Sequence, residues 1–316
     1  MPELPEVETI ARGVELRLRG DRIVEAWFGS YPKLFKTPAE WQAKELKGRA
    51  VLSVHRTGKH IVCELGTADG NAQSHPSRKT DEKQVLRLSC APPRTTAARA
   101  GHPGAGLGEL ESTPSAQWIV HLCMTGRLLV TLPEAPLAPH THARLTLASG
   151  RELRFVDPRR FGRLEFRDLS REAGFRAAGA DPLAVTVEEL ARLFRSRHLA
   201  VKTALLNQKL LSGVGNIYAD ESLFRAAIRP RRLSGRLTKA ELERLRLALR
   251  EVLEAAIRLG GSSVSDYVDA EGVRGFFQLE HCVYQRAGLA CRRCQTPIRR
   301  IVLGGRGTHY CPKCQR

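Results

Sequence analysis

Residues 291–314 read CRRCQTPIRRIVLGGRGTHYCPKC and contain two Cys-x-x-Cys pairs separated by sixteen residues. This spacing is typical of a tetrahedral Zn²⁺ bound by four thiolates at about 2.3 Å. Four protein ligands leave no open coordination position, so we expect a structural ion that folds a short ribbon. The predicted zinc ligands are Cys291, Cys294, Cys311 and Cys314.

The residues between the two cysteine pairs indicate a β-hairpin whose glycine-rich tip presents Arg306. Arg299 and Arg300 precede the tip, and three arginines on a rigid hairpin favour contact with phosphate groups. A solvated turn charge is the alternative interpretation of Arg306. Zinc ribbons are common in nucleic-acid proteins, so this module alone names no activity.

The chain upstream of the cysteine module has a helical pattern from about residue 186. Thr238 and Glu241 form a capping box that opens a long helix, and Gly260 ends it. The turn 213–216 (Gly-Val-Gly-Asn) precedes another helix, whose free N–H groups are able to bind a phosphate. An ordinary glycine-rich connection is the alternative for this turn. The other expected helices are 187–194, 202–211 and 217–227.

The first half of the chain combines one helix with several short strands. The helix begins close to Pro5, because Val7, Ile10 and Val14 recur at helical spacing. Residues 66–116 interrupt the strands, are rich in Gly, Ala, Pro, Ser and Thr, and are expected to form a disordered surface insertion. The spacing of the strands predicts a β-sandwich. They are expected at 22–28, 50–55, 61–65, 117–122, 127–132, 142–147 and 152–156.

The 316-residue chain carries 51 Lys and Arg against 33 Asp and Glu, a formal charge of +18 with a pI near 10.1. Such an excess favours a polyanionic partner, although an arginine-rich proteome would also produce it. No run approaches the roughly 20 apolar residues that span a bilayer, and no secretory signal is visible. We therefore expect a cytoplasmic protein with no membrane partner.

Five motifs in chain order resemble formamidopyrimidine-DNA glycosylase, a bifunctional DNA glycosylase and AP lyase family of bacteria. Together with the cysteine module they cover the chain except for the insertion. The resemblance implies an α+β fold with an N-terminal catalytic β-sandwich domain (1–165), a helix-two-turn-helix DNA-binding domain (166–280) and a C-terminal zinc β-hairpin finger (281–316). The motifs are Met1–Thr9 (MPELPEVET), Gly58-Lys59, His121–Leu128 (HLCMTGRL), Asp157–Gly162 (DPRRFG) and Gly213–Phe224 (GVGNIYADESLF).

The resemblance assigns catalysis to the N-terminus. If Met1 is removed, Pro2 becomes a secondary amine with a pKa of roughly 7.7–8.0, so far more of it is neutral at pH 7 than of a lysine. A neutral amine can attack the sugar carbon of a damaged nucleotide and form a Schiff base. Glu3 lies beside this amine and is placed to act as general acid and base.

Three further residues have catalytic or supporting roles in the resembled family. Glu6 supports the site by ordering water and the terminal amine. Lys59 donates a proton in β-elimination and binds phosphate. An exposed lysine taken by itself would indicate only a surface charge that favours solubility. Arg306 contacts the lesion phosphate and serves the δ-elimination step. None of these roles follows from spacing alone.

A glycosylase must turn the damaged nucleotide out of the base stack, at a cost of about a few kcal/mol. Side chains that fill the gap offset this cost. The resemblance assigns the filling to Met124, Arg159 and Phe161, which would otherwise be two core residues and a surface charge. It also matches residues 260–277 to a mobile loop over the everted base. The implied DNA contacts are His140, Arg159, Arg160, Arg197, Lys202 and Asn216.

The predicted function is base-excision repair of double-stranded DNA, by a monomer at the nucleoid. The expected lesions are oxidised purines (8-oxoguanine and formamidopyrimidines), with strand cleavage by β,δ-elimination. The closest alternative is the related endonuclease VIII, which removes oxidised pyrimidines. Leu4, Met124 and the Arg159–Phe161 pair favour the purine enzyme.

A non-catalytic DNA-binding zinc protein is the other alternative. It would have lost Pro2, Glu3 or Lys59, and all three are present.

Two features depart from the family pattern. Cys123 occupies a position where the family usually has glycine, which would alter the approach of Met124 to DNA. The insertion is expected to be a solvated tail on the β-domain, and the alternative is that it folds over the groove and changes lesion access.

Overall fold

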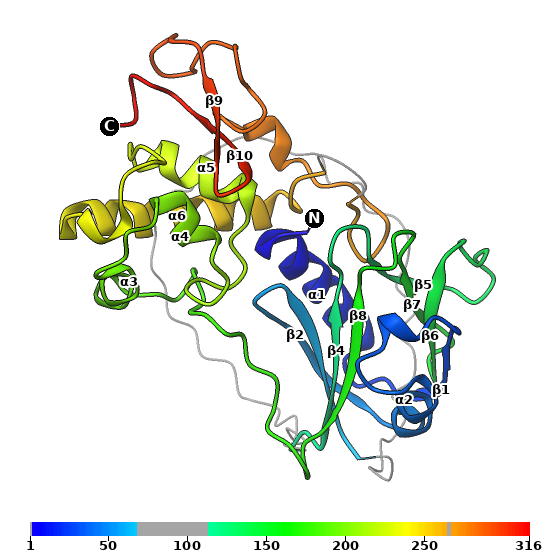
Figure 1. Cartoon of the computed structure of the whole chain (residues 1–316). Coiled ribbons are helices and arrows are strands. Elements are labelled where there is room, and N and C mark those ends of the chain that lie inside the picture. The colour runs from blue at the N-terminus through cyan, green and yellow to red at the C-terminus, as the bar shows by residue number, and fades with distance from the viewer. Residues whose placement is uncertain (1, 68–112, 264–266) are drawn as a thin grey trace, which may run out of the picture.

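The computed structural model describes residues 2–67, 113–263 and 267–316. Within these residues the long strands form two four-stranded antiparallel sheets and one two-stranded hairpin. The first sheet has the order β1-β6-β7-β5 and the second the order β2-β3-β4-β8 (Figure 1). The strands of the first sheet are β1 (Ile23–Phe28), β6 (Thr141–Leu147), β7 (Glu152–Val156) and β5 (Arg127–Thr131). Those of the second are β2 (Val51–Thr57), β3 (His60–Leu65), β4 (Ala116–His121) and β8 (Arg163–Asp168).

Helix α1 (Leu4–Leu18) packs against both sheets and shares one buried cluster with them. Its apolar face carries Val7, Ile10 and Val14 into this cluster at helical spacing, as the sequence predicts. Trp118 of β4 is also buried there, and its indole N–H donates to Gln42. The sequence-based prediction omits β8, the short helix α2 (Ala39–Leu46) and the 3₁₀ turn η1 (Pro32–Leu34).

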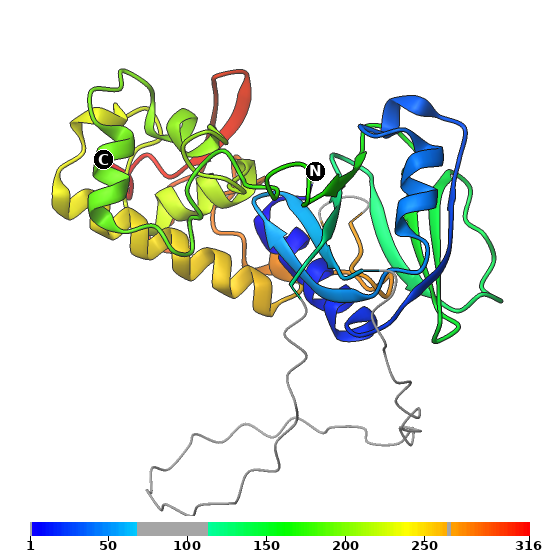
Figure 2. The same cartoon turned by 90° about the horizontal axis from the view of Figure 1, so that it is seen from below.

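The helical part lies on one side of α1 and the sheets on the other, in both views (Figures 1 and 2). The second buried cluster of the protein lies in this helical part and is built from four helices and the first turn of α1. The side chain of Thr238 accepts a hydrogen bond from the Glu241 N–H, so the predicted capping box opens α6. The elements are α3 (Val187–Phe194), α4 (Val201–Leu206), α5 (Asn216–Arg225), α6 (Lys239–Arg258) and the 3₁₀ turns η2 (Ser234–Arg236) and η3 (Phe277–Glu280).

One predicted helix is wrong in extent. The sequence predicts a helix over 202–211, but α4 ends at Leu206. Asn207 adopts an extended backbone, and its side-chain oxygen accepts the N–H of Lys209. Asparagine competes with helical hydrogen bonding in this way, so the chain leaves the helix and turns toward Gly213.

The C-terminal residues form a hairpin of β9 (Arg299–Leu303) and β10 (Arg306–Tyr310), joined by Gly304 and Gly305 with positive φ. A third buried cluster joins this hairpin region to Phe224 of α5. The described residues contain three buried clusters, and the division at 1–165, 166–280 and 281–316 stays a prediction. The predicted insertion lies outside the described residues between 68 and 112. No helix of the described residues is long and apolar enough to cross a membrane.

Candidate active site and zinc centre

Glu3 is the N-cap residue of α1 and contacts the helical part through α5. It is 4% exposed, and its carboxylate accepts the backbone N–H groups of Ile217 (3.2 Å) and Tyr218 (3.4 Å). These groups belong to the first turn of α5, where the helix carries partial positive charge. A Cβ on Gly215 would lie only 2.1 Å from Glu3 Cδ, so this glycine makes room for the carboxylate. The sequence leaves open whether this helix end binds phosphate or is an ordinary connection; in the structure two of its N–H groups bind Glu3.

Glu6 is equally buried and connects three segments of the chain. One oxygen accepts the Glu3 N–H at 2.8 Å. The other accepts the Ser262 N–H at 2.8 Å and the hydroxyl of Tyr218. Gly261 packs against it, because a Cβ there would meet Glu6 Cγ at 3.0 Å. Glu6 therefore holds the N-terminus against α5 and the residues that follow α6.

The ionisation of these groups is shifted toward neutral pH. Burial raises the pKa of Glu3 to about 7, with Lys59 opposing the rise and Glu6 adding to it. Burial also raises the pKa of Glu6. Burial lowers the pKa of Lys59, while Glu3 and Glu6 counteract the lowering and Arg306 adds to it. A carboxylic acid that titrates near pH 7 can both accept and donate a proton during a reaction.

Lys59 lies at the tip of the β2–β3 hairpin, where Gly58 has a φ of +64°. A Cβ on Gly58 would lie 2.1 Å from Ser212 Oγ, so the tip is docked closely on the helical part. Lys59 is 8% exposed, and buried Pro2 directly precedes Glu3. Arg306 is exposed at the start of β10 and is close enough to affect the pKa of Lys59. The structure thus brings together residues that are distant in sequence.

The predicted void-filling side chains lie on two loops organised by Asp157. Met124 is 41% exposed and Phe161 44% exposed, so both apolar side chains are accessible to a partner. The Arg159 guanidinium lies 4.9 Å from the centre of the Phe161 ring. Asp157 is fully buried and accepts the hydroxyl of Thr125 at 2.6 Å and the N–H of Gly162 at 2.8 Å, so it joins both loops.

The backbone next to these side chains explains why glycine suits position 123. Cys123 has a φ of +54°, a left-handed conformation that costs a non-glycine residue about 1–2 kcal/mol. Its sulfur lies 3.2 Å from His121 Nδ1. His140 and Arg160 have φ values of +65° and +59° and are exposed. The Arg160 guanidinium also lies 5.0 Å from the centre of the Tyr31 ring.

Lys202 is predicted to contact DNA phosphate, and in the structure its side chain has protein partners. It is fully buried, its ammonium forms an ion pair with Asp220 at 2.7 Å, and it donates to the Gly307 carbonyl at 2.9 Å. Asn216 donates to the same carbonyl at 3.0 Å. Both side chains therefore hold the hairpin residue that follows Arg306.

Arg197 lies after α3 and away from this network. It is exposed, and its guanidinium donates to the Leu193 carbonyl at 2.7 Å. No contact of the structure joins it to the cluster around Glu3 within the described residues.

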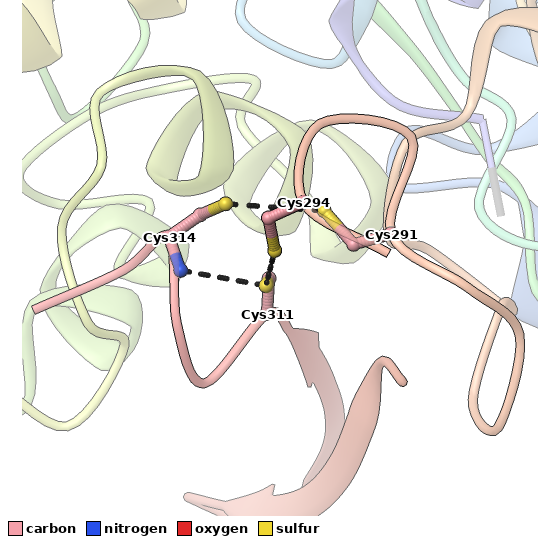
Figure 3. Close-up of side chains that lie close together, drawn as sticks. All are labelled: Cys291, Cys294, Cys311 and Cys314. Carbon is pink, nitrogen blue, oxygen red and sulfur yellow. Dashed lines mark hydrogen bonds between the residues drawn. The ribbon is translucent and has the colours of Figure 1, made fainter. Parts of the chain in front are cut away.

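The four predicted zinc ligands converge in one cluster (Figure 3). Their sulfur atoms all lie within 4.8 Å of one another, with Cys291–Cys314 at 3.9 Å and Cys294–Cys311 at 3.4 Å. Thiolates at about 2.3 Å from a tetrahedral ion lie about 3.8 Å apart, so the cluster fits one structural Zn²⁺. Among the described residues, no other cluster of three or more His, Cys, Asp or Glu side chains could hold a metal ion.

Helix α5 attaches this zinc centre to the active site. Glu221 accepts three consecutive backbone N–H groups, those of 282–284, at 2.7–2.9 Å. Asp220 accepts the N–H of His309 at 2.9 Å. Phe224 packs into the zinc cluster, and the Arg293 guanidinium lies 4.5 Å from the centre of its ring. One helix therefore holds Glu3 at its N-terminus and the zinc hairpin along its length.

Comparison with known proteins identifies the family. The sequence model of the formamidopyrimidine-DNA glycosylase N-terminal domain matches residues 1–164. The Solibacter usitatus formamidopyrimidine-DNA glycosylase is 39% identical over the full length of both chains. The chain belongs to the formamidopyrimidine-DNA glycosylase family. The family's H2TH domain matches residues 178–268, and a zinc finger found in FPG and IleRS matches 288–316.

Further relatives agree with this assignment. The formamidopyrimidine-DNA glycosylase of Thioalkalivibrio sulfidiphilus is 37% identical over the full length of both chains. Among solved structures, a complex of a Lactococcus lactis FPG mutant with DNA containing Fapy-dG superposes with a TM-score of 0.76, at 29% identity and full coverage of both chains. A complex of Lactococcus lactis Fpg with abasic-site DNA also has a TM-score of 0.76, at 29% identity over 99% of each chain.

The protein is therefore a base-excision-repair DNA glycosylase, and AP lyase activity is known for its family. The predicted α+β fold, with an N-terminal domain, an H2TH domain and a zinc finger, is confirmed. The predicted set of four cysteines for one structural zinc is confirmed as well. Sequence reasoning missed Asp157, Asp220 and Glu221, although all three lie within the motifs that carry the resemblance. Acidic residues inside the mostly apolar stretch after the 213–216 turn are the signal that could have found Asp220 and Glu221, whereas Asp157 stands beside two arginines and has no such signal.

Proposed function

We propose that the enzyme excises oxidised purines, namely 8-oxoguanine and formamidopyrimidines, and cleaves the strand through a Schiff base on Pro2. The observation that carries this proposal is the buried Glu3 carboxyl, which titrates near pH 7 beside Pro2 and Lys59. The name of the relatives, formamidopyrimidine-DNA glycosylase, and the Lactococcus complex with Fapy-dG DNA support the lesion class. Removal of Met1 is part of the proposal, since it creates the secondary amine.

The reaction follows from the chemistry of these groups. The neutral Pro2 amine attacks C1′: the N–C1′ bond forms, the bond from C1′ to the damaged base breaks, and the amine proton leaves with the base. Glu3 gives a proton to the sugar ring oxygen as the C1′–O4′ bond breaks and the iminium forms, and it later accepts a proton. In β-elimination a proton leaves C2′ with Lys59 assisting its transfer, the C3′–O bond breaks and the 3′ phosphate leaves. In δ-elimination a proton leaves C4′, the C5′–O bond breaks beside Arg306 and the 5′ phosphate leaves, after which water hydrolyses the iminium and frees Pro2. The zinc ion takes no part in these steps, because four thiolates leave it no open coordination position.

Double-stranded DNA is the proposed partner, and binding turns the damaged nucleotide out of the stack. Met124 and Phe161 are exposed on neighbouring loops, which suits an apolar plug and a wedge. Arg159 lies over Phe161 and suits contact with the orphaned base. The other proposed contacts are those of His140, Arg160, Arg197 and Asn216, whereas Lys202 is proposed to act by holding the hairpin.

The domain division at 1–165, 166–280 and 281–316 remains part of this proposal. So do action as a monomer and residence at the nucleoid. A formal charge of +18 supports accumulation on DNA, because phosphate neutralisation releases counterions.

Borohydride trapping on two duplexes tests the proposal, one with 8-oxoguanine opposite cytosine and one with thymine glycol. A covalent adduct on the first duplex, mapped to Pro2 by mass spectrometry, is expected. Glu3→Gln keeps the size of the side chain and serves as a variant with a defective acid. It is expected to bind both duplexes and to lose excision of 8-oxoguanine.

Two outcomes contradict the proposal. An adduct on thymine glycol alone would assign the enzyme to oxidised pyrimidines, in the manner of endonuclease VIII. An intact Met1 in a fully active preparation would exclude Pro2 as the nucleophile. Sedimentation analysis of the free protein checks the monomeric state.

A further inference from the structure

Arg56, near the end of β2, forms a buried junction of three chain segments. Its side chain is 5% exposed. The guanidinium donates to Glu8 of α1 at 2.8 Å and to Asp181, in the segment leading to α3, at 2.6 Å. A third donation, at 3.3 Å, goes to the backbone carbonyl of Gly58. One planar group therefore connects α1, the helical part and the tip of the β2–β3 hairpin.

The Arg56 junction is adjacent to Lys59 in the hairpin tip. Gly58 is the residue before Lys59, and its left-handed backbone fits closely against Ser212 and Ala177. The side chain of Ser212 and the guanidinium of Arg56 thus contact the hairpin tip at adjacent points. The tip is fixed relative to α1, the helix that begins beside Pro2 and Glu3.

We propose that Arg56 is a positioning residue that sets the location of Lys59 relative to the N-terminal amine. The inference rests on the proposed function, because it takes Lys59 to assist β-elimination. Arg56 does not contact the reacting atoms. It acts through the Gly58 carbonyl and through the two carboxylates that fix its own guanidinium.

The geometry of arginine is what this position requires. Its rigid fork presents several N–H donors in one plane, so it satisfies two carboxylates and a carbonyl together. A lysine ammonium at the same place retains the charge but is too compact to reach three acceptors on three segments. A displacement of about 1 Å in a catalytic group can lower a rate roughly a hundredfold, so loss of the fork is expected to matter for Lys59.

The test separates formation of the iminium from β-elimination on a duplex with an abasic site. Borohydride trapping measures the iminium, and a denaturing gel measures strand cleavage in a single turnover. Arg56→Gln is expected to lower the rate of cleavage per trapped adduct by roughly tenfold, and Arg56→Lys by less. A loss of folded protein would reduce trapping and cleavage together and leave this ratio unchanged.

Arg12→Gln is the matched control. Arg12 also pairs with Glu8, at 2.8 Å, but its side chain is 67% exposed and does not contact the hairpin. Its substitution is expected to leave the ratio unchanged. Asp181→Asn, which weakens the Arg56 contact from the other side, is expected to lower the ratio in the same direction as Arg56→Gln.

Lys59→Met, measured in parallel, tests the proposed role of Lys59 separately from that of Arg56. A low ratio in both Lys59→Met and Arg56→Gln, with Arg12→Gln unchanged, supports the positioning role. A low ratio in Lys59→Met with a normal ratio in Arg56→Gln overturns the inference and leaves the proposed function standing. A normal ratio in Lys59→Met removes Lys59 from β-elimination, and the inference falls with it.

Discussion

Gly215→Ala is the substitution that most directly probes how the active-site carboxylate is held. The backbone at Gly215 is extended, with φ −129° and ψ −164°, so alanine adopts it without strain. The added Cβ, however, would lie 2.1 Å from Glu3 Cδ and 2.4 Å from Glu3 Oε1. The carboxylate must therefore move away from the N-terminus of α5.

The expected cost follows from the two hydrogen bonds that Glu3 accepts from Ile217 and Tyr218. Each bond to a charged acceptor contributes about 1.5–3 kcal/mol, and leaving a buried group unsatisfied costs a similar amount. Both bonds are long, at 3.2 and 3.4 Å, and the carboxyl is partly protonated at neutral pH. We therefore expect the free energy of unfolding to fall by about 2 kcal/mol, which for a chain of this length corresponds to a Tm lower by about 3 °C. Excision is expected to fall by roughly a hundredfold, because Glu3 is displaced by more than an ångström.

The assay combines thermal unfolding with single-turnover excision of 8-oxoguanine. Gly29→Ala is the control, because a Cβ there meets nothing closer than 3.6 Å. In a Glu3→Ala background, Gly215→Ala should cost much less stability, since the side chain that it displaces is gone. Full activity and an unchanged Tm in Gly215→Ala would refute the reasoning, as would an equal cost with and without Glu3.

Three further predictions concern ionisation, the zinc centre and the buried ion pair. Because the pKa of Glu3 is raised from 4.5 to about 7, the folded protein binds more protons than the unfolded chain in this window, so stability falls as pH rises through it. Glu3→Gln should reduce this pH-dependent loss of unfolding free energy by on the order of 3 kcal/mol at most. Urea unfolding at about pH 5 and about pH 7.5 measures the difference. Cys294→Ser should abolish zinc binding and DNA affinity. Tryptophan fluorescence should stay unchanged, because the three tryptophans, Trp27, Trp41 and Trp118, lie outside the zinc finger. A changed emission spectrum would show that the ion also stabilises the sheets. Asp220→Ala should destabilise the protein by about 3–5 kcal/mol by leaving Lys202 buried without its partner, and adding Lys202→Met should restore part of the lost Tm; no restoration would exclude the unpaired charge as the cause.

The zinc ligands and the long regular elements could be predicted from sequence because their signals are local. Two Cys-x-x-Cys pairs specify a metal by spacing, and the Thr238 capping box specifies a helix start within four residues. The predicted helix 187–194 and the predicted strand 152–156 match α3 and β7 at both ends. In each of these cases the information lies within one segment.

The interactions that position the site could not be predicted, because they join residues far apart in sequence. Nothing near Lys202 indicates that it is fully buried, since its partner Asp220 and the Gly307 carbonyl come from other elements. The turn before α5 has the glycines of a phosphate-binding loop, but the acceptor is Glu3, more than 200 residues earlier. Periodicity and spacing carry no information on which distant anion a helix end receives.

The arrangement around α5 also restricts how this protein can vary. Each residue advances a helix by about 100°, so deleting one residue within Asn216–Arg225 would turn the side chains beyond the deletion away from their present neighbours. Asp220 and Glu221 would then no longer face the zinc hairpin, while the first turn would still receive Glu3. The ten-residue length of α5 thus fixes the rotation between the Glu3 site and the zinc hairpin. We expect homologues to lack insertions and deletions within this helix.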